Sequence, residues 1–251
     1  MSSVRLFVLI AFAALGVVPA TAQHTDRPND GRAVRGEARA NVVVGVPRQS
    51  FRDNIDGLGY GGSLFAGARL GQTPIVLGLD LGILVYGRTE ESVPFSGTVG
   101  PRVMVDVVTT NNILEPHLVV RLQPAEGRVR PYVDGLFGFK YLFTETKVRD
   151  DDVGGDDRDI ASTTNFSDVA LSGGVGGGLD LRVYRAPPEA EVKTVSVHLG
   201  AQYLVGQRAE YLAEGNLEDT NGNGRLDDSE LPIRRSTTTL LQPQIGVTVQ
   251  F

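Results

Sequence analysis

The sequence ends with residues 236–251, STTTLLQPQIGVTVQF, and this stretch decides the fold. Side chains on a β-strand point alternately to opposite faces, so the stretch divides into two sets. The apolar face consists of Thr239, Leu241, Pro243, Ile245, Val247, Val249 and the terminal Phe251. The other face is almost entirely polar and consists of Leu240, Gln242, Gln244, Gly246, Thr248 and Gln250. Such alternation predicts a strand that lies between an apolar and a polar environment.

The same alternation recurs along the chain and predicts eight strands. We expect them at residues 36–46, 57–70, 75–88, 103–122, 128–148, 168–184, 192–212 and 236–251. Short turns at 71–74, 123–127 and 185–191 alternate with long polar loops at 89–102, 149–165 and 213–234. An even number of antiparallel strands with long loops at one end is typical of an outer-membrane barrel. Within 103–122 the alternation slips at residues 109–112, which predicts a β-bulge there.

Residues 1–22 predict a cleaved signal peptide. Arg5 precedes an apolar run at 6–15, and Ala20-Thr21-Ala22 supplies the small residues of a cleavage site. A membrane-anchor helix is the alternative, but the run is short for one. Residues 23–35 are polar and are interpreted as a periplasmic lead-in to a barrel at 36–251. No other apolar run reaches the roughly 20 residues of a membrane-spanning helix.

The composition excludes several classes of site. The chain has no Cys, so it has no disulfide, no thiolate metal site and no Cys nucleophile. Its net charge of -6 argues against nucleic acid as a partner.

A soluble barrel with an apolar interior also fits eight alternating strands. Two features favour the opposite orientation, with the apolar face on the lipid. The polar face is crowded with Gly and Ser, which suits a narrow interior, and the aromatic bulk lies on the apolar face. The terminal Phe251 is a third feature that favours the membrane barrel.

The proposed lumen contains charges of both signs in equal number. The acidic residues are Glu37, Asp80, Glu115, Asp134 and Asp180, and the basic residues are Arg39, Arg69, Arg121, Lys140 and Arg182. An unpaired buried charge is costly, so we expect these groups to pair and fill the barrel. The sequence therefore predicts a plugged barrel rather than a wide pore.

These features resemble the small outer-membrane β-barrel family of the OmpA/OmpX type. The resemblance covers about residues 36–251 and rests on the strand count, the loop asymmetry, the segment RPYVDGLFGF at 130–139 and the C-terminal signal. That signal comprises Gln244, Gly246, Val249 and Phe251.

The resemblance implies an all-β, eight-stranded antiparallel up-and-down transmembrane β-barrel, monomeric, in the outer membrane of a Gram-negative-type bacterium. Its partners would be outer-membrane lipid and the barrel-insertion machinery, which would read the strand ending in Phe251. The family includes membrane-stabilising, adhesive and small-solute barrels and a few enzymes, so the resemblance leaves the function open.

Residues 219–230, DTNGNGRLDDSE, match the template of a calcium-binding loop. Gly224 permits the sharp turn, and Glu230 closes the site with both carboxylate oxygens. The predicted ligands are Asp219, Asn221, Asn223, the Arg225 carbonyl, Asp227 through water, and Glu230. Pro232 follows at once and no clear helix flanks the motif, so we expect a weak Ca²⁺ site with a dissociation constant on the order of 10⁻⁴–10⁻³ M. The alternative is a solvated acidic loop that matches by chance.

Ser196 and His198 share one strand face, and some outer-membrane lipid hydrolases use a Ser and a His two residues apart. The order is reversed here and the face is the lumen, so we interpret the pair, like His117, as packed polar groups. We therefore expect a non-enzymatic protein with a structural or surface-interaction role. A narrow channel for ions or small solutes and an outer-membrane lipid-modifying enzyme remain alternatives.

Overall fold

The computed structural model describes residues 36–55, 57–94, 104–150, 158–187, 189–212 and 233–251, with side chains at most of these positions. The predicted signal peptide at 1–22, the lead-in at 23–35 and the calcium motif at 219–230 lie outside the described residues.

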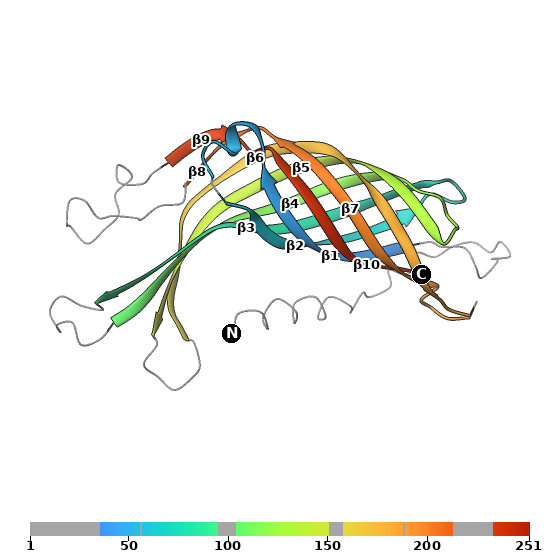
Figure 1. Ribbon diagram of the computed structural model, residues 1–251, viewed down its shortest axis with the longest axis horizontal. Helices are drawn as coiled ribbons and strands as arrows, with labels where there is room; N and C mark the ends of the chain where they lie inside the picture. Colours follow the sequence, from blue (N-terminus) through green and yellow to red (C-terminus); the bar gives the residue numbers. More distant parts are fainter. Residues whose placement is uncertain (1–35, 56, 95–103, 151–157, 188, 213–232) are drawn as a thin grey trace.

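Eight antiparallel strands close into a barrel (Figure 1). They are β1 (Gly36–Pro47), β2 (Gly59–Arg69), β3 (Ile75–Pro94), β4 (Met104–Leu122), β5 (Val129–Asp150), β6 (Arg158–Arg185), β7 (Thr194–Gly206) and β10 (Leu240–Gln250). The order around the barrel is β1-β10-β7-β6-β5-β4-β3-β2, and β1 pairs with β10 to close it. The predicted all-β, eight-stranded antiparallel barrel is confirmed.

The two ends of the barrel differ. The turns at 70–74, 123–128 and 186–193 lie at the end that also carries Gly36 and Phe251, which we call the turn end. At the opposite end, the loop end, β3 to β6 continue past their neighbours and curve away as a four-stranded extension (Figure 1). The β2–β3 ladder stops at Tyr60 and Val85, and the β6–β7 ladder stops at Ser172 and Gly206.

Two predicted strands are each broken into two in the structure. Instead of one strand at 192–212, β7 ends at Gly206 and β8 (Arg208–Leu212) follows; instead of one strand at 236–251, β9 (Ile233–Thr237) precedes β10. β8 and β9 pair with each other in a separate two-stranded sheet. At the break, the Gln207 N–H still donates to the Leu171 carbonyl of β6, where the β6–β7 ladder ends. In addition, β6 begins at Arg158, ten residues before the predicted start at 168.

The β-bulge predicted at residues 109–112 of β4 is found instead in the partner strand, β3, directly opposite those residues. The β3–β4 ladder shifts between Val85 and Gly87, opposite Asn111 and Asn112 of β4. The extra residue is therefore Tyr86 of β3, and the slip that the sequence shows in β4 reflects a bulge in its partner.

The outward face is apolar and the inward face is polar. Phe137 and Val133 of β5 and Leu79 of β3 keep 60% or more of their surface exposed. The barrel-level charges of the same strands, Asp80, Arg130, Asp134 and Lys140, are buried. This distribution is the reverse of a soluble barrel and confirms the predicted orientation of the two faces. Among the described residues, no helix is long and apolar enough to span a membrane.

Candidate functional site

The lumen is filled by side chains, and its turn-end half is organised around Arg121 of β4. Arg121 donates two hydrogen bonds to the Asp134 carboxylate of β5, both of 2.7 Å, and a third of 2.8 Å to Glu37 of β1. Its guanidinium carbon lies 4.3 Å from the ring centre of Phe65 and 4.2 Å from that of Tyr132. A planar guanidinium suits both the paired carboxylate and the aromatic faces.

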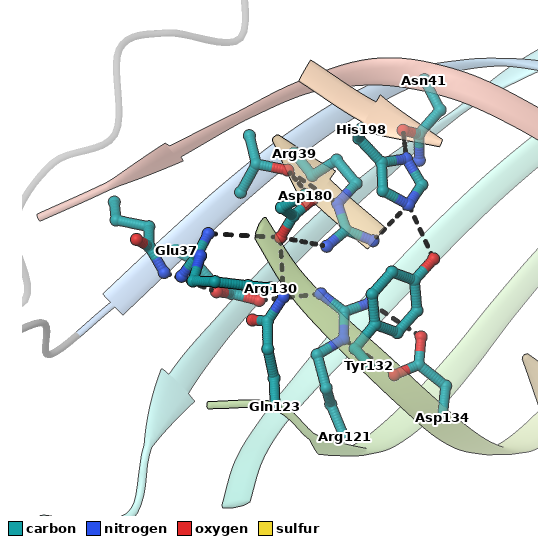
Figure 2. Close-up of polar contacts among 12 residues, drawn as sticks. Glu37, Arg39, Asn41, Arg121, Gln123, Arg130, Tyr132, Asp134, Asp180 and His198 are labelled. Atoms are coloured by element: carbon teal, nitrogen blue, oxygen red, sulfur yellow. Dashed lines mark hydrogen bonds and ion pairs between the residues drawn. The ribbon is translucent and has the colours of Figure 1, made fainter. Parts of the chain in front are cut away.

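Asp180 of β6 is a second centre in the same half of the lumen (Figure 2). Its Oδ2 accepts hydrogen bonds from Gln123 at 2.7 Å, Arg130 at 3.2 Å and Arg39 at 3.5 Å. Its Oδ1 accepts a hydrogen bond from Thr248 at 3.1 Å, and Arg39 in turn donates to Thr248. Asp180 is fully buried, so these donors supply the charge and hydrogen bonds that replace water.

His198 of β7 joins the Arg39 side of this network (Figure 2). Its Nδ1 lies 2.8 Å from Asn41 Oδ1, and its Nε2 lies 2.6 Å from the Tyr132 hydroxyl and 3.1 Å from Arg39 Nη1. The acceptor oxygen of Asn41 places a proton on Nδ1 and leaves Nε2 as an acceptor.

The two residues of the Ser196–His198 pair share the lumen face, but they are not joined. Both are fully buried, and Ser196 Oγ has no hydrogen-bond partner among the described residues. Both ring nitrogens of His198 contact other side chains. The serine–histidine hydrogen bond that activates a nucleophile is therefore absent between these two residues.

The middle of the lumen holds a second set of polar groups. Lys140 Nζ of β5 lies 3.3 Å from Glu115 Oε1 of β4 and donates a 2.6 Å hydrogen bond to the Thr238 carbonyl. Gln242 donates to Glu115, and Gln202 donates a 2.9 Å hydrogen bond to Asp80. His117 lies within hydrogen-bond distance of Ser172, as expected for a packed lumen group.

An apolar cluster fills the loop end of the lumen, and we call it the apolar plug. Three rings form its centre: Phe51 of the 3₁₀ turn η1 (Gln49–Phe51), Tyr86 of β3 and Tyr211 of β8. Phe51 is completely buried, and Tyr211 is 1% exposed. The buried residues around the rings are Val43, Ile55, Leu84, Ile113, Leu142, Ala170, Ala209 and Leu240.

The plug was not predicted from the sequence, because Phe51 and Ile55 lie in a segment that reads as a polar loop. Their spacing of four residues in an otherwise polar stretch was the available signal. The segment returns over the barrel end, where Ser50 Oγ lies 2.7 Å from Thr237 Oγ1 of β9.

Eight of the ten predicted lumen charges are buried. Arg69 is only half-buried at the turn end, where it donates to the carbonyls of Thr73 and Gln123. Arg182 is also half-buried, and the β6–β7 register shifts between it and Tyr184. Arg130, which was not among the predicted charges, is 2% exposed and takes the place beside Asp180 instead.

The predicted Ca²⁺ ligands Asp219, Asn221, Asn223, Arg225, Asp227 and Glu230 lie outside the described residues. Within the described part of the chain, no group of three or more His, Asp or Glu side chains is arranged to hold a metal ion. The structure does fix the ends of the segment that carries the motif, because Leu212 of β8 pairs with Ile233 of β9.

Comparison with known proteins gives distant structural similarities only. No protein-family model and no curated protein sequence matches the chain. Among solved structures, the chain is similar to Neisserial surface protein A, with 14% identity, a TM-score of 0.37 and coverage of 86% of this chain and 96% of that one. It is also similar to a major outer membrane protein from Thermus thermophilus, with 17% identity, a TM-score of 0.29 and coverage of 85% and 99%. Similarities of this size carry no inference about what the chain binds.

Proposed function

We propose that the protein is a non-enzymatic barrel of the bacterial outer membrane with a structural or surface-interaction role. The observation that carries this proposal is the combination of an exposed apolar exterior with a lumen that side chains fill, polar ones at the turn end and in the middle and apolar ones at the loop end. An exterior of this kind is stable in lipid and a liability in water. The turn end would face the periplasm, and the loop end would face the outside of the cell.

The closing strand supports the proposed contacts with outer-membrane lipid and the insertion machinery. β10 lies between β1 and β7, and Phe251 is 41% exposed at its end. The Phe251 N–H donates to the Gly36 carbonyl, and the Gly36 N–H donates to Phe251. The barrel is closed by these pairings and needs no second chain, which supports a monomer.

The alternatives make different demands on the lumen. A narrow channel needs a continuous path, which both the Arg121 network and the apolar plug obstruct. A lipid-modifying enzyme needs a free base near a nucleophile, and His198 is hydrogen-bonded elsewhere. These contacts favour the structural role over both alternatives.

Three measurements on one preparation test the proposal. Cell fractionation with heat-modifiable gel migration should place a compact barrel in the outer membrane. Planar bilayers containing the protein should show no large, steady conductance, and a lipid-hydrolysis assay should give the same background for the protein and its His198→Ala variant. Steady porin-like currents would establish the channel instead, and hydrolysis that His198→Ala abolishes would establish the enzyme.

We also propose that residues 219–230 form a weak Ca²⁺ site on the outer surface. The pairing of Leu212 with Ile233 supports this, because it holds together the two ends of a segment whose sequence matches a calcium loop. Millimolar calcium outside the cell suits a site of the expected affinity.

A further inference from the structure

A small cavity lies in the middle of the lumen, with room for about one water molecule. Strands β1, β2, β3, β4, β7 and β10 contribute its lining. The polar side chains that line it are Ser63, Asp80, Glu115, His117, Gln202 and Gln242.

Asp80 is incompletely satisfied at this cavity. Its carboxylate is buried, with 7% of the residue exposed, and Oδ2 accepts the 2.9 Å hydrogen bond from Gln202. Its Oδ1 is buried and has no hydrogen-bond partner among the described residues. A buried carboxylate in this condition is costly unless a positive charge reaches it.

The neighbouring groups do not supply that charge. Lys140 forms an ion pair with Glu115 and donates a hydrogen bond to the Thr238 carbonyl. A neutral His117 ring satisfies both of its contacts, because Nδ1–H can donate to the Glu115 carbonyl at 3.3 Å and the Ser172 hydroxyl can donate to Nε2 at 3.0 Å. The nearest arginines, Arg39 and Arg121, pair with other carboxylates in the turn-end half.

Glu115 is the second carboxylate that lines the cavity. Its Oε1 accepts no hydrogen bond among the described residues, although Lys140 Nζ lies 3.3 Å away. Lys140 balances the charge of Glu115, so the pair of carboxylates retains one uncompensated negative charge. The cavity thus has two carboxylates in its lining and room for about one water-sized occupant. Its two carboxylates have one cationic partner, Lys140, so one negative charge is not balanced.

We propose that Asp80 and Glu115 hold one small monovalent cation of the sodium class in this cavity. Carboxylate, amide and hydroxyl oxygens are the ligands that hard cations prefer. The single missing charge selects a monovalent ion over a divalent one, and the limited space selects an ion that has lost most of its water.

The test measures thermal unfolding of the purified, folded barrel in NaCl and in choline chloride at equal ionic strength, with a calcium chelator in every sample. Choline is too large for the cavity. We expect the wild-type midpoint to be higher in NaCl, by roughly 3–6 °C at ten times the dissociation constant. Asp80→Asn keeps an acceptor for Gln202 but removes the charge, and it should abolish the difference. Asp53→Asn, the same change at an exposed position, should keep it.

Equal wild-type midpoints in the two salts would overturn the proposal. A second outcome would also overturn the proposal. If the wild-type midpoint rises equally in both salts as the pH falls, and Asp80→Asn removes that rise, then a proton and not a cation neutralises Asp80. If Asp80→Asn does not fold, sodium NMR on the wild-type barrel decides. Line broadening beyond that of the urea-unfolded chain supports the site, and its absence contradicts it.

Discussion

Arg121 and Asp134 face each other across the β4–β5 ladder and are joined by two hydrogen bonds of 2.7 Å, with side chains that are 2% and 1% exposed. Their pairing follows from register, because the ladder places the two residues directly opposite. The third contact of Arg121, with Glu37, crosses the lumen to β1. The guanidinium thus joins neighbouring strands and the two sides of the barrel at once.

Asp134→Asn should destabilise the barrel by about 1.5–3 kcal/mol, because it replaces the bidentate carboxylate partner of Arg121 with a neutral amide. Glu37 remains as the ionised partner of the buried guanidinium. Urea titration followed by heat-modifiable gel migration measures the loss. The exposed Asp53→Asn is the matched control and should stay within about 0.5 kcal/mol of wild type. Equal midpoints for the two variants would show that the pair contributes little.

Gly138→Ala should impair closure of the barrel. A Cβ at Gly138 would overlap the Pro116 carbonyl on β4, so the two backbones would have to separate. Gly135 lies on the same strand, and a Cβ there meets nothing closer than the Val120 carbonyl at 4.0 Å. Gly135→Ala should therefore insert and fold normally. The yield of heat-modifiable protein compares the two, and equal yields would contradict the prediction.

Phe51→Ala should loosen the loop end at a cost of about 3–5 kcal/mol, because it leaves a cavity in the apolar plug. We also expect faster trypsin cleavage at the neighbouring exposed Arg52. Phe137→Ala removes an equal side chain from the lipid-facing surface, where Phe137 is 64% exposed. That control should leave the cleavage rate unchanged, and equal cleavage in the two variants would indicate that Phe51 does not hold the segment.

The plug should weaken at alkaline pH through Tyr211. Burial raises the pKa of its phenol above the ordinary value, although its contact with Ser236 opposes the shift. Because the folded protein holds the neutral phenol, its stabilising contribution is complete below the ordinary pKa of about 10 and is lost as pH rises above it. Unfolding midpoints from pH 8 to pH 11 should therefore fall more steeply for wild type than for Tyr211→Phe. Parallel slopes would contradict this role.

Glu230→Gln should remove calcium-dependent protection of residues 213–232 from protease, since the predicted site loses its bidentate ligand. Limited trypsin digestion with millimolar calcium and with chelator provides the measurement. Glu126→Gln, at an exposed turn on the opposite end of the barrel, is the control and should retain the calcium effect. Protection that persists in Glu230→Gln would eliminate the proposed ligand set.

The period-two pattern was sufficient to predict the eight-stranded barrel, because it marks where each strand lies. The orientation of the two faces also needed the Gly- and Ser-rich polar face, the aromatic bulk of the apolar face and Phe251, because a soluble barrel alternates in the same way. The pattern could not locate the break at Gln207, since alternation is the same whichever strand a segment pairs with. It placed Arg182 on the face of Asp180, but Arg182 lies near the turn end of β6 and is only half-buried there. Arg130 has the same parity as Asp134 on β5, so the pattern was sufficient to place it in the lumen although it was not among the predicted charges. Phe51 was missed for a different reason: its burial depends on a loop that returns across the barrel end, and loops carry no periodic signal.

The interior contacts of β1 have a consequence for the order of assembly. Glu37, Arg39 and Asn41 reach across to Arg121 of β4, Asp180 of β6 and His198 of β7, none of which lies on a strand next to β1. β1 precedes these strands in the sequence, so the three contacts form only when the barrel closes, although Asn41 also donates to Ser63 of the neighbouring β2. Closing the β1–β10 ladder therefore requires these polar side chains to exchange water for partners on the far strands of the barrel.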